Sequence, residues 1–294
     1  MLSAAKFEKT FQYMTLFWQG VVCTVSLSAL TVLFGFILAL ILAMARLSDL
    51  NAYRFLSTGS QRALQNRGGF VYALSRFNPV KFLATAYVEI FRATPMLVQL
   101  FIIYSVVFAD VTVLPGFKLF GFIRFDRFFP GVVALALNSG AYLSEIIRSG
   151  IQSIDGGQTE AARSLGMSQW QNMRYIVLPQ AIKNILPAIA NEFVTIIKES
   201  SICYTIGVQD IMSAVAAVKG ATFSIAEPLV VATALYFCLT YPTSKIIAHF
   251  EKKMSAGDNR NGGVPHQRER KRKLGLAGAG AAPVPMHAAE EDKQ

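Results

Sequence analysis

The chain has 294 residues, of which 53% are hydrophobic and 16% are charged, and its mean hydropathy is +0.41. Soluble domains average about 25% charged residues, and several apolar runs here approach the roughly 20 residues that cross a bilayer. The composition therefore predicts an integral membrane protein and argues against a soluble core. The formal net charge of +10 invites a nucleic-acid role. The positive charges lie in loops and in a tail, as the positive-inside rule expects, so no nucleic-acid partner is predicted.

Nothing in the sequence predicts catalysis. The three cysteines, Cys23, Cys203 and Cys238, each stand alone in an apolar run, so neither a disulfide nor a metal site is expected. The phosphate-binding pattern GxxxxGK[ST] is missing from the sequence, and no Ser/His/Asp or paired-carboxylate arrangement stands out. We therefore expect no catalytic residue, no metal ligand and no cofactor bound by this chain.

The first apolar run, residues 18–45, predicts a membrane-spanning helix. It is longer than the roughly 7–15-residue core of a secretory signal, and arginines follow it instead of preceding it. The next loop, residues 46–81, carries Lys and Arg residues against the single acid Asp49, which predicts a cytoplasmic loop. A solvated loop is the favoured interpretation, and a surface for anionic membrane lipid is the alternative.

A second span covers residues 84–108. Glu89 and Arg92 are one turn apart and can pair before the membrane begins. Thr94 can cap a new helix that starts with Pro95, so the span can be two offset helices. A single helix with a proline kink is the alternative, and the sequence leaves both open.

Polar residues interrupt the later spans. A third span is predicted over residues 130–147, a fourth over 185–207 and a fifth over 229–247. A charge at the centre of a membrane helix costs about 2.5–3.5 kcal/mol on the insertion scale, so these polar groups should face other helices, a partner subunit or water. The groups concerned are Asn138, Asn191, Glu192, Lys198 and Glu199.

Together these segments predict an all-α, polytopic membrane protein with about five transmembrane helices, its N-terminus outside and its C-terminus cytoplasmic. We expect a membrane domain over residues 1–254, with cytoplasmic loops at 46–81 and 151–183. Residues 255–294 are rich in Gly, Ala and Pro and contain a basic run. They predict a disordered cytoplasmic tail, for which a solvated end is favoured over contact with lipid or RNA.

The polar stretch between the third and fourth spans has the pattern of two short helices around a glycine corner. Thr159 can cap the first helix, and Gly166 can end it in the left-handed conformation. Ser168 and Gln171 have the spacing of a capping box that begins the second helix. Pro179 is expected to terminate that helix.

This stretch resembles the cytoplasmic EAA loop of ABC importer permeases, type I. The spacing Glu-Ala-Ala, three residues, Gly, nine residues, Ile-x-Leu-Pro is filled by Glu160, Ala161, Ala162, Gly166, Ile176, Leu178 and Pro179. The resemblance implies a coupling helix that docks in a groove of a separate ATPase subunit, which would bind ATP and Mg. The candidate docking residues are Glu160, Ala161, Ala162, Leu165, Gly166 and Trp170.

Within that family the chain is most similar to permeases for polar amino acids. The similarity lies in the stretch from Tyr87 to Tyr104, where Ala93 replaces the usual Gly of Phe-Arg-Gly-Thr-Pro, in Asn138–Tyr142, and in Gln158 ahead of the Glu-Ala-Ala motif. It implies a multi-pass protein of the bacterial inner membrane that works with a second permease subunit, the same or homologous. It also implies an extracytoplasmic binding protein that delivers an amino acid.

The resemblance and the polar residues together suggest a solute path. The candidates to face the solute are Gln99, Asn138, Tyr142, Asn191 and Glu192. Lys198 and Glu199 are a candidate intramembrane charge pair that either gates the path or packs the dimer. A permease for an osmolyte or oxyanion is the alternative function, and a membrane-anchored scaffold or channel is a further one.

Overall fold

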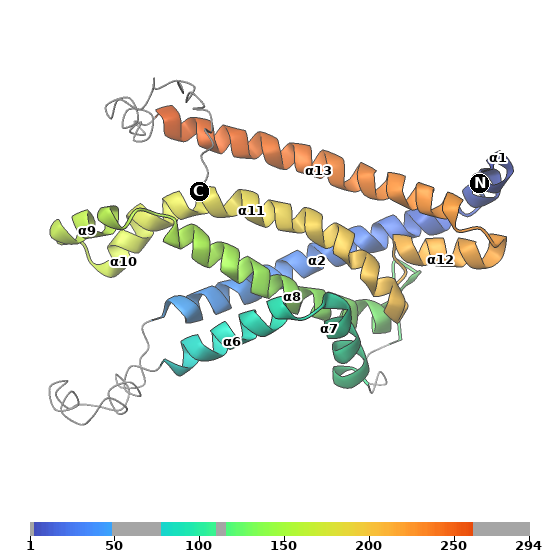
Figure 1. Cartoon of the computed structure of the whole chain (residues 1–294), viewed down its shortest axis with the longest axis horizontal. Helices are drawn as coiled ribbons and strands as arrows, with labels where there is room; N and C mark the ends of the chain where they lie inside the picture. Colours follow the sequence, from blue (N-terminus) through green and yellow to red (C-terminus); the bar gives the residue numbers. More distant parts are fainter. Residues whose placement is uncertain (1–2, 49–77, 110–115, 261–294) are drawn as a thin grey trace, which may run out of the picture. The chain divides into compact units, whose positions relative to one another are not determined.

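The computed structural model describes residues 3–48, 78–109 and 116–260, with side chains up to residue 254. These residues are almost entirely helical (Figure 1), which confirms the all-α class. In chain order the helices are α1 (Ala4–Phe11), α2 (Met14–Leu47), α6 (Pro79–Ala93), α7 (Met96–Ile102), η1 (Ile103–Val107), α8 (Phe125–Gln152), α9 (Gly156–Ser164), α10 (Gln169–Asn172), η3 (Met173–Val177), α11 (Leu178–Glu199), η4 (Ser200–Ile206), α12 (Ile211–Thr222) and α13 (Ala226–Arg260). Strands β1 (Lys118–Leu119) and β2 (Ile123–Arg124) form a small antiparallel pair.

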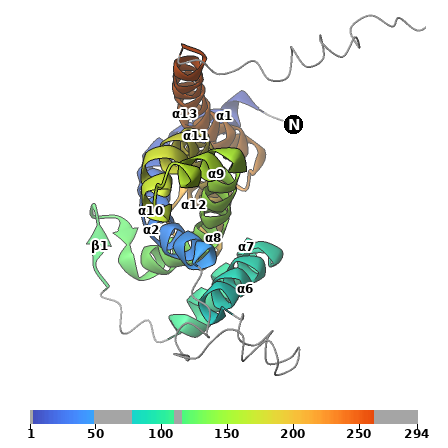
Figure 2. The same ribbon diagram turned by 90° about the vertical axis from the view of Figure 1, so that its left-hand side faces the viewer.

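The helix α2 packs mainly against α8, and α6 packs against both of them (Figure 2). Small residues allow the close approach, as is common between membrane helices. A side chain at Gly35 would lie 3.2 Å from the Ser139 hydroxyl, and one at Gly140 would lie 2.8 Å from Leu38. The helices α2 and α8 therefore form the centre around which the other helices are arranged.

Two apolar clusters at different levels of α8 hold the helices together. One cluster contains Leu27 of α2, Leu100 of α7 and Leu135 of α8. The other, nearer the α9 end of α8, brings Leu143 against Ile185 of α11. Both ends of α8 are thus fixed by packing against neighbouring helices, which positions the segment that follows it.

Three helices are long and apolar enough to cross a membrane: α2, α8 and α13 up to Met254. Two bent pairs also qualify, α6 with α7–η1 (111°) and Gln169–Ile206 with α12 (47°). The described residues therefore contain three to five candidate spans, and the predicted number of about five agrees with the upper value. The chain is a multi-pass membrane protein.

Some predicted details are decided by the structure. The second span is two helices that meet at Thr94 and Pro95, not one kinked rod. No ion pair joins Glu89 to Arg92 in the described part of the chain. Residues 255–260 continue α13 instead of beginning a disordered tail. The rest of that tail and most of the loop 46–81 lie outside the described residues.

Candidate functional site

The segment between α8 and α11 begins with an Asx-capped helix. Asp155 precedes α9, and its carboxylate accepts a hydrogen bond from the Gly157 amide at 2.8 Å. The prediction that Thr159 caps this helix is therefore wrong, because the Asp155 carboxylate, four residues earlier, is the acceptor at its start. Thr159 lies inside α9, where its hydroxyl accepts a hydrogen bond from the Asn172 side chain at 3.1 Å. This bond joins α9 to α10.

The corner after α9 is made by Gly166, as predicted. Its φ is +81°, in the left-handed region that other residues resist. The Met167 amide donates to the Ala162 carbonyl at 3.0 Å, which closes the end of the helix. No heavy atom lies within 4 Å of a Cβ added at Gly166, leaving aside its chain neighbours. Backbone conformation, and not lack of space, is what favours glycine here.

The second short helix has the predicted capping box. The Gln171 amide donates to the Ser168 hydroxyl at 3.2 Å, and the Ser168 amide donates to the Gln171 side chain at 2.8 Å. The expectation that Pro179 ends this helix is wrong. Pro179 stands in the first turn of α11, which continues from α10 through η3 without a break, so the helical segment runs on past this proline.

The two short helices present large apolar side chains to the outside. Leu165 is 84% exposed and Trp170 is 69% exposed, and both were predicted to dock a partner. Glu160 and Ala161 are also exposed, whereas Ala162 is 2% exposed and packs against its own chain. Large apolar side chains exposed within a polar segment are candidates for contact with another protein. We call Leu165 and Trp170, with the exposed Glu160 and Ala161, the docking face.

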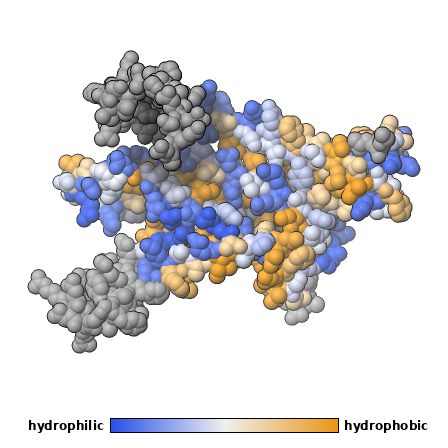
Figure 3. Space-filling view, viewed as in Figure 1, coloured by the Kyte–Doolittle hydropathy of each residue, from blue (hydrophilic) through white to orange (hydrophobic). Residues whose placement is uncertain are grey.

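The docking face lies at one end of α8 and α11 (Figure 1), in a region whose surface is largely hydrophilic (Figure 3). Sequence reasoning missed Tyr175, which is 66% exposed on the same segment. The signal for it was a large aromatic residue within a polar stretch.

Side-chain hydrogen bonds attach this segment to the long helices. The Gln180 side chain of α11 donates to the Gln158 side chain of α9 at 2.6 Å. The Asn184 side chain donates to the Ser153 hydroxyl at the end of α8 at 3.0 Å. The first bond joins α9 to α11, and the second joins α11 to the end of α8.

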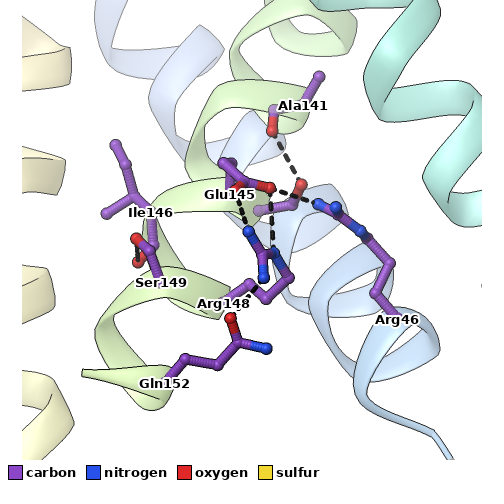
Figure 4. A network of polar contacts seen from close by, with 8 residues as sticks. Arg46, Ala141, Glu145, Ile146, Arg148, Ser149 and Gln152 are labelled. Carbon is purple, nitrogen blue, oxygen red and sulfur yellow. Dashed lines mark hydrogen bonds and ion pairs between the residues drawn. The ribbon is translucent and has the colours of Figure 1, made fainter. Parts of the chain in front are cut away.

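A charged cluster connects the last turns of α8 to α2. The Glu145 carboxylate accepts a hydrogen bond from Arg46 of α2 at 2.7 Å. It also binds the guanidinium of Arg148, one turn further along α8 (Figure 4). Arg46 has only 9% of its side chain exposed, so the pair is largely shielded from solvent. Sequence reasoning missed this contact, for which the only signal was an arginine at the end of the first span.

The five residues predicted to face a solute divide into two groups: three lie on α7 and α8, and two lie on α11. Gln99 of α7 and Asn138 of α8 are buried, and the Asn138 amide donates to the Gln99 side-chain oxygen at 2.9 Å. Tyr142 lies one turn further along α8 and is 39% exposed, with the guanidinium carbon of Arg92 5.6 Å from its ring centre.

The remaining predicted polar residues lie on α11. Asn191 is exposed and Glu192 is half-buried. Among the described residues, no ion pair joins Lys198 to Glu199, because successive residues on a helix do not face each other. In the described part of the chain no group of three or more His, Cys, Asp or Glu residues could hold a metal ion.

The sequence and the fold match known transport proteins. The model of the family described as "binding-protein-dependent transport system inner membrane component" matches residues 65–256. An arginine transport system permease protein of Bacillus subtilis is 42% identical over 185 residues, which are 63% of this chain and 80% of the relative. A putative glutamine transport system permease protein of Rickettsia conorii is 34% identical over 251 residues, 83% of this chain and 98% of the relative.

The fold also matches solved structures of ABC transporters. The crystal structure of an amino acid ABC transporter with histidines has 36% sequence identity and a TM-score of 0.69, and the match covers 86% of this chain and 100% of that one. Inward-facing conformations of a methionine ABC transporter match with a TM-score of 0.57 over 82% of this chain and 97% of that one. At 18% identity the second match bears on the fold alone.

Proposed function

The chain belongs to the family of binding-protein-dependent transport system inner membrane components, and on this basis we propose that it forms, as a dimer, the membrane path of an ATP-driven importer for polar amino acids. The observation that carries the proposal is the docking face. Leu165 and Trp170 are exposed on a short helical segment between two membrane-spanning parts of the chain. A protein partner would cover these side chains, and an ATPase subunit that drives the transport cycle fits this role.

The substrate class is supported by the relatives. One is named for arginine transport and another for glutamine transport, and the similar solved structure is that of an amino acid transporter with histidines. These amino acids share a zwitterionic backbone and a polar side chain. A binding protein outside the cell would supply the amino acid, and ATP with Mg would bind to the ATPase.

The proposed orientation puts the docking face in the cytoplasm. The basic residues that follow α2, beginning with Arg46, support this placement by the positive-inside rule. The N-terminus is then outside and the C-terminus inside, in the inner membrane of a bacterium. The ATPase can reach Leu165 and Trp170 only in this orientation.

The polar face of α11 supports a dimer. Asn184, Asn191 and Lys198 are spaced seven residues apart, so they lie along one face of the helix, and all three are exposed in the single chain. Polar side chains at membrane depth do not face lipid. A second permease subunit and an aqueous path between the two subunits would cover this face.

The contacts of the docking segment give the coupling its mechanical route. ATP-driven closure of the ATPase subunits moves α9 and α10. The Gln158–Gln180 pair transfers the movement to α11, and the Glu145–Arg46 pair transfers it from α8 to α2. The path between the two permease subunits then opens to the other side of the membrane.

The test is uptake of radiolabelled arginine and glutamine by proteoliposomes that contain this chain, its co-purifying ATPase and the binding protein. ATP-dependent accumulation of a polar amino acid is expected. The matched control carries an ATPase variant that cannot hydrolyse ATP and should show no accumulation. Transport of an osmolyte or oxyanion, with no uptake of any polar amino acid, would refute the substrate class.

A further inference from the structure

The bend between α6 and α7 leaves a backbone carbonyl without its helical partner. In a continuous helix the Phe91 carbonyl would accept a hydrogen bond from residue 95, but Pro95 has no N–H. Thr94 adopts an extended conformation, with φ −110° and ψ 145°, and the two helix axes differ by 111°. Because lipid offers no hydrogen bonds, an unpaired carbonyl within a membrane-spanning segment is costly.

The side chain of Gln99 replaces the missing donor. Its amide nitrogen lies 2.7 Å from the Phe91 carbonyl, 3.1 Å from the Thr94 carbonyl and 2.7 Å from the Thr94 hydroxyl. The Thr94 hydroxyl donates in turn to the Ile90 carbonyl at 2.8 Å. A single side-chain amide thus donates to a carbonyl at the end of α6 and to the carbonyl of Thr94 at the bend itself.

Asn138 of α8 holds this amide in place. Its side-chain nitrogen lies 2.9 Å from the Gln99 oxygen and 3.4 Å from the Phe91 carbonyl. Gln99 is 7% exposed and Asn138 is 6% exposed. An amide NH₂ carries two hydrogens, and the acceptors around each of the two nitrogens already use them. Neither nitrogen has a hydrogen left for a solute.

We propose that Gln99 and Asn138 are positioning residues of the permease, which set the angle between α6 and α7–η1, and that their side-chain nitrogens do not bind the transported solute. We call Thr94, Gln99 and Asn138 the elbow clasp. That the clasp serves transport rests on the proposed function. The role of its hydrogen bonds in holding the angle rests on geometry alone.

The surroundings explain why the angle needs a clasp. On one side, Leu100 and Ile103 pack into the apolar cluster with α2 and α8. The bend also borders an open, largely apolar pocket of about 200 Å³, lined by residues of α6, α7 and η1 that include Ile90, Ile102 and the clasp residues Thr94 and Gln99. The exposed surface over α7 is also hydrophobic (Figure 3). Apolar contacts around an open pocket do not specify one angle, whereas directed hydrogen bonds do.

The angle can be measured with a spin label on each arm of the bend. Leu83 on α6 is 67% exposed and Val106 on η1 is 70% exposed, so both accept a labelled cysteine, in a background where the exposed Cys238 is replaced by serine. In the complex in lipid nanodiscs, we expect one narrow distance distribution. Gln99→Leu and Asn138→Leu should broaden or shift it.

Gln12→Leu is the matched control, because Gln12 is an exposed residue that follows α1. It should leave the distribution unchanged. Distributions for both Gln99→Leu and Asn138→Leu that match the distribution without these substitutions would overturn the proposal.

Pro95→Ala provides a second test, because alanine restores the backbone N–H that the Phe91 carbonyl lacks. If Gln99 stands in for that donor, Gln99→Leu should change the distance distribution less in the Pro95→Ala background than in the native one. An equal change in both backgrounds would show that the Phe91 carbonyl is not the group that Gln99 serves.

Measurements of amino acid uptake distinguish a positioning role of Gln99 from a role in binding the solute. We expect Gln99→Leu to lower the maximal rate of amino acid uptake about tenfold, the factor that corresponds to one lost buried hydrogen bond. The order of preference among competing amino acids should stay the same. A changed preference with unchanged spin-label distances would identify Gln99 as a solute ligand and refute the proposal. If the native chain imports no amino acid, the proposed function fails, while the spin-label distances still decide the clasp.

Discussion

Replacement of Gly166 by valine should uncouple ATP hydrolysis from transport. Gly166 has φ +81°, and a left-handed backbone costs an ordinary residue about 1–2 kcal/mol. A β-branched residue lies at the upper end of this range. Because a Cβ at this position would meet no neighbouring atom within 4 Å, the whole cost is conformational. About 1.4 kcal/mol corresponds to a tenfold change in an equilibrium constant, so the population of the native corner should fall about tenfold or more.

Gly156 offers a matched control on the same segment. A Cβ there also meets no atom within 4 Å, and its φ is not in the left-handed region. Gly156→Val therefore adds the same side chain without the backbone strain. The amount of membrane-inserted protein, measured by fluorescence-detected size exclusion, should be the same for both variants.

The assay compares amino acid uptake with ATP hydrolysis stimulated by the binding protein, in the same proteoliposomes. Gly166→Val should lower uptake per ATP hydrolysed about tenfold, and Gly156→Val should lower it less than about twofold. Normal uptake by Gly166→Val would refute the reasoning. An equal loss in both variants would also refute it, because the loss would then come from the added side chain and not from φ.

Three further outcomes test other parts of the structure. Leu165→Asp together with Trp170→Asp should abolish co-purification of the ATPase subunit, because a charge is placed in an apolar contact. Retention of the ATPase by this variant would refute the assignment of the docking face. Glu145→Gln should lower the free energy of unfolding by about 1–3 kcal/mol, because two arginines lose their counter-charge. In a thermal-shift assay, the double variant Glu145→Gln with Arg46→Gln should recover part of this loss. If the losses of the two single variants simply add in the double variant, Glu145 and Arg46 are not coupled. Glu192→Gln should weaken uptake of cationic amino acids relative to neutral ones, and an unchanged preference in competition assays would exclude a solute contact at this position.

Features whose interacting groups are near in sequence were predictable. The capping box of Ser168 and Gln171 involves residues three positions apart, and the left-handed corner at Gly166 depends on one residue's own backbone. The membrane spans follow from the length of apolar runs. The resemblance to the EAA loop implied Leu165 and Trp170 as docking residues, and both side chains are exposed.

Predictions failed where several local candidates compete or where the partner is distant. Asp155 and Thr159 are both acceptable caps, and the bond from Asn172 shows that Thr159 has another role. Pro179 can end one helix or begin the next, and only the path of the chain into α11 decides between them.

The sequence by itself determined the class of the protein, its number of apolar segments, and the Gly166 corner and Ser168–Gln171 capping box of its docking segment, because these depend on composition and on neighbours within a few residues. Only the tertiary structure decided which partners the polar groups of the long helices meet. Gln99 meets Asn138 across 39 positions of sequence, and Arg46 meets Glu145 across 99. The same amide can bind a solute or close a helix break, and its surroundings in three dimensions determine which acceptors it reaches.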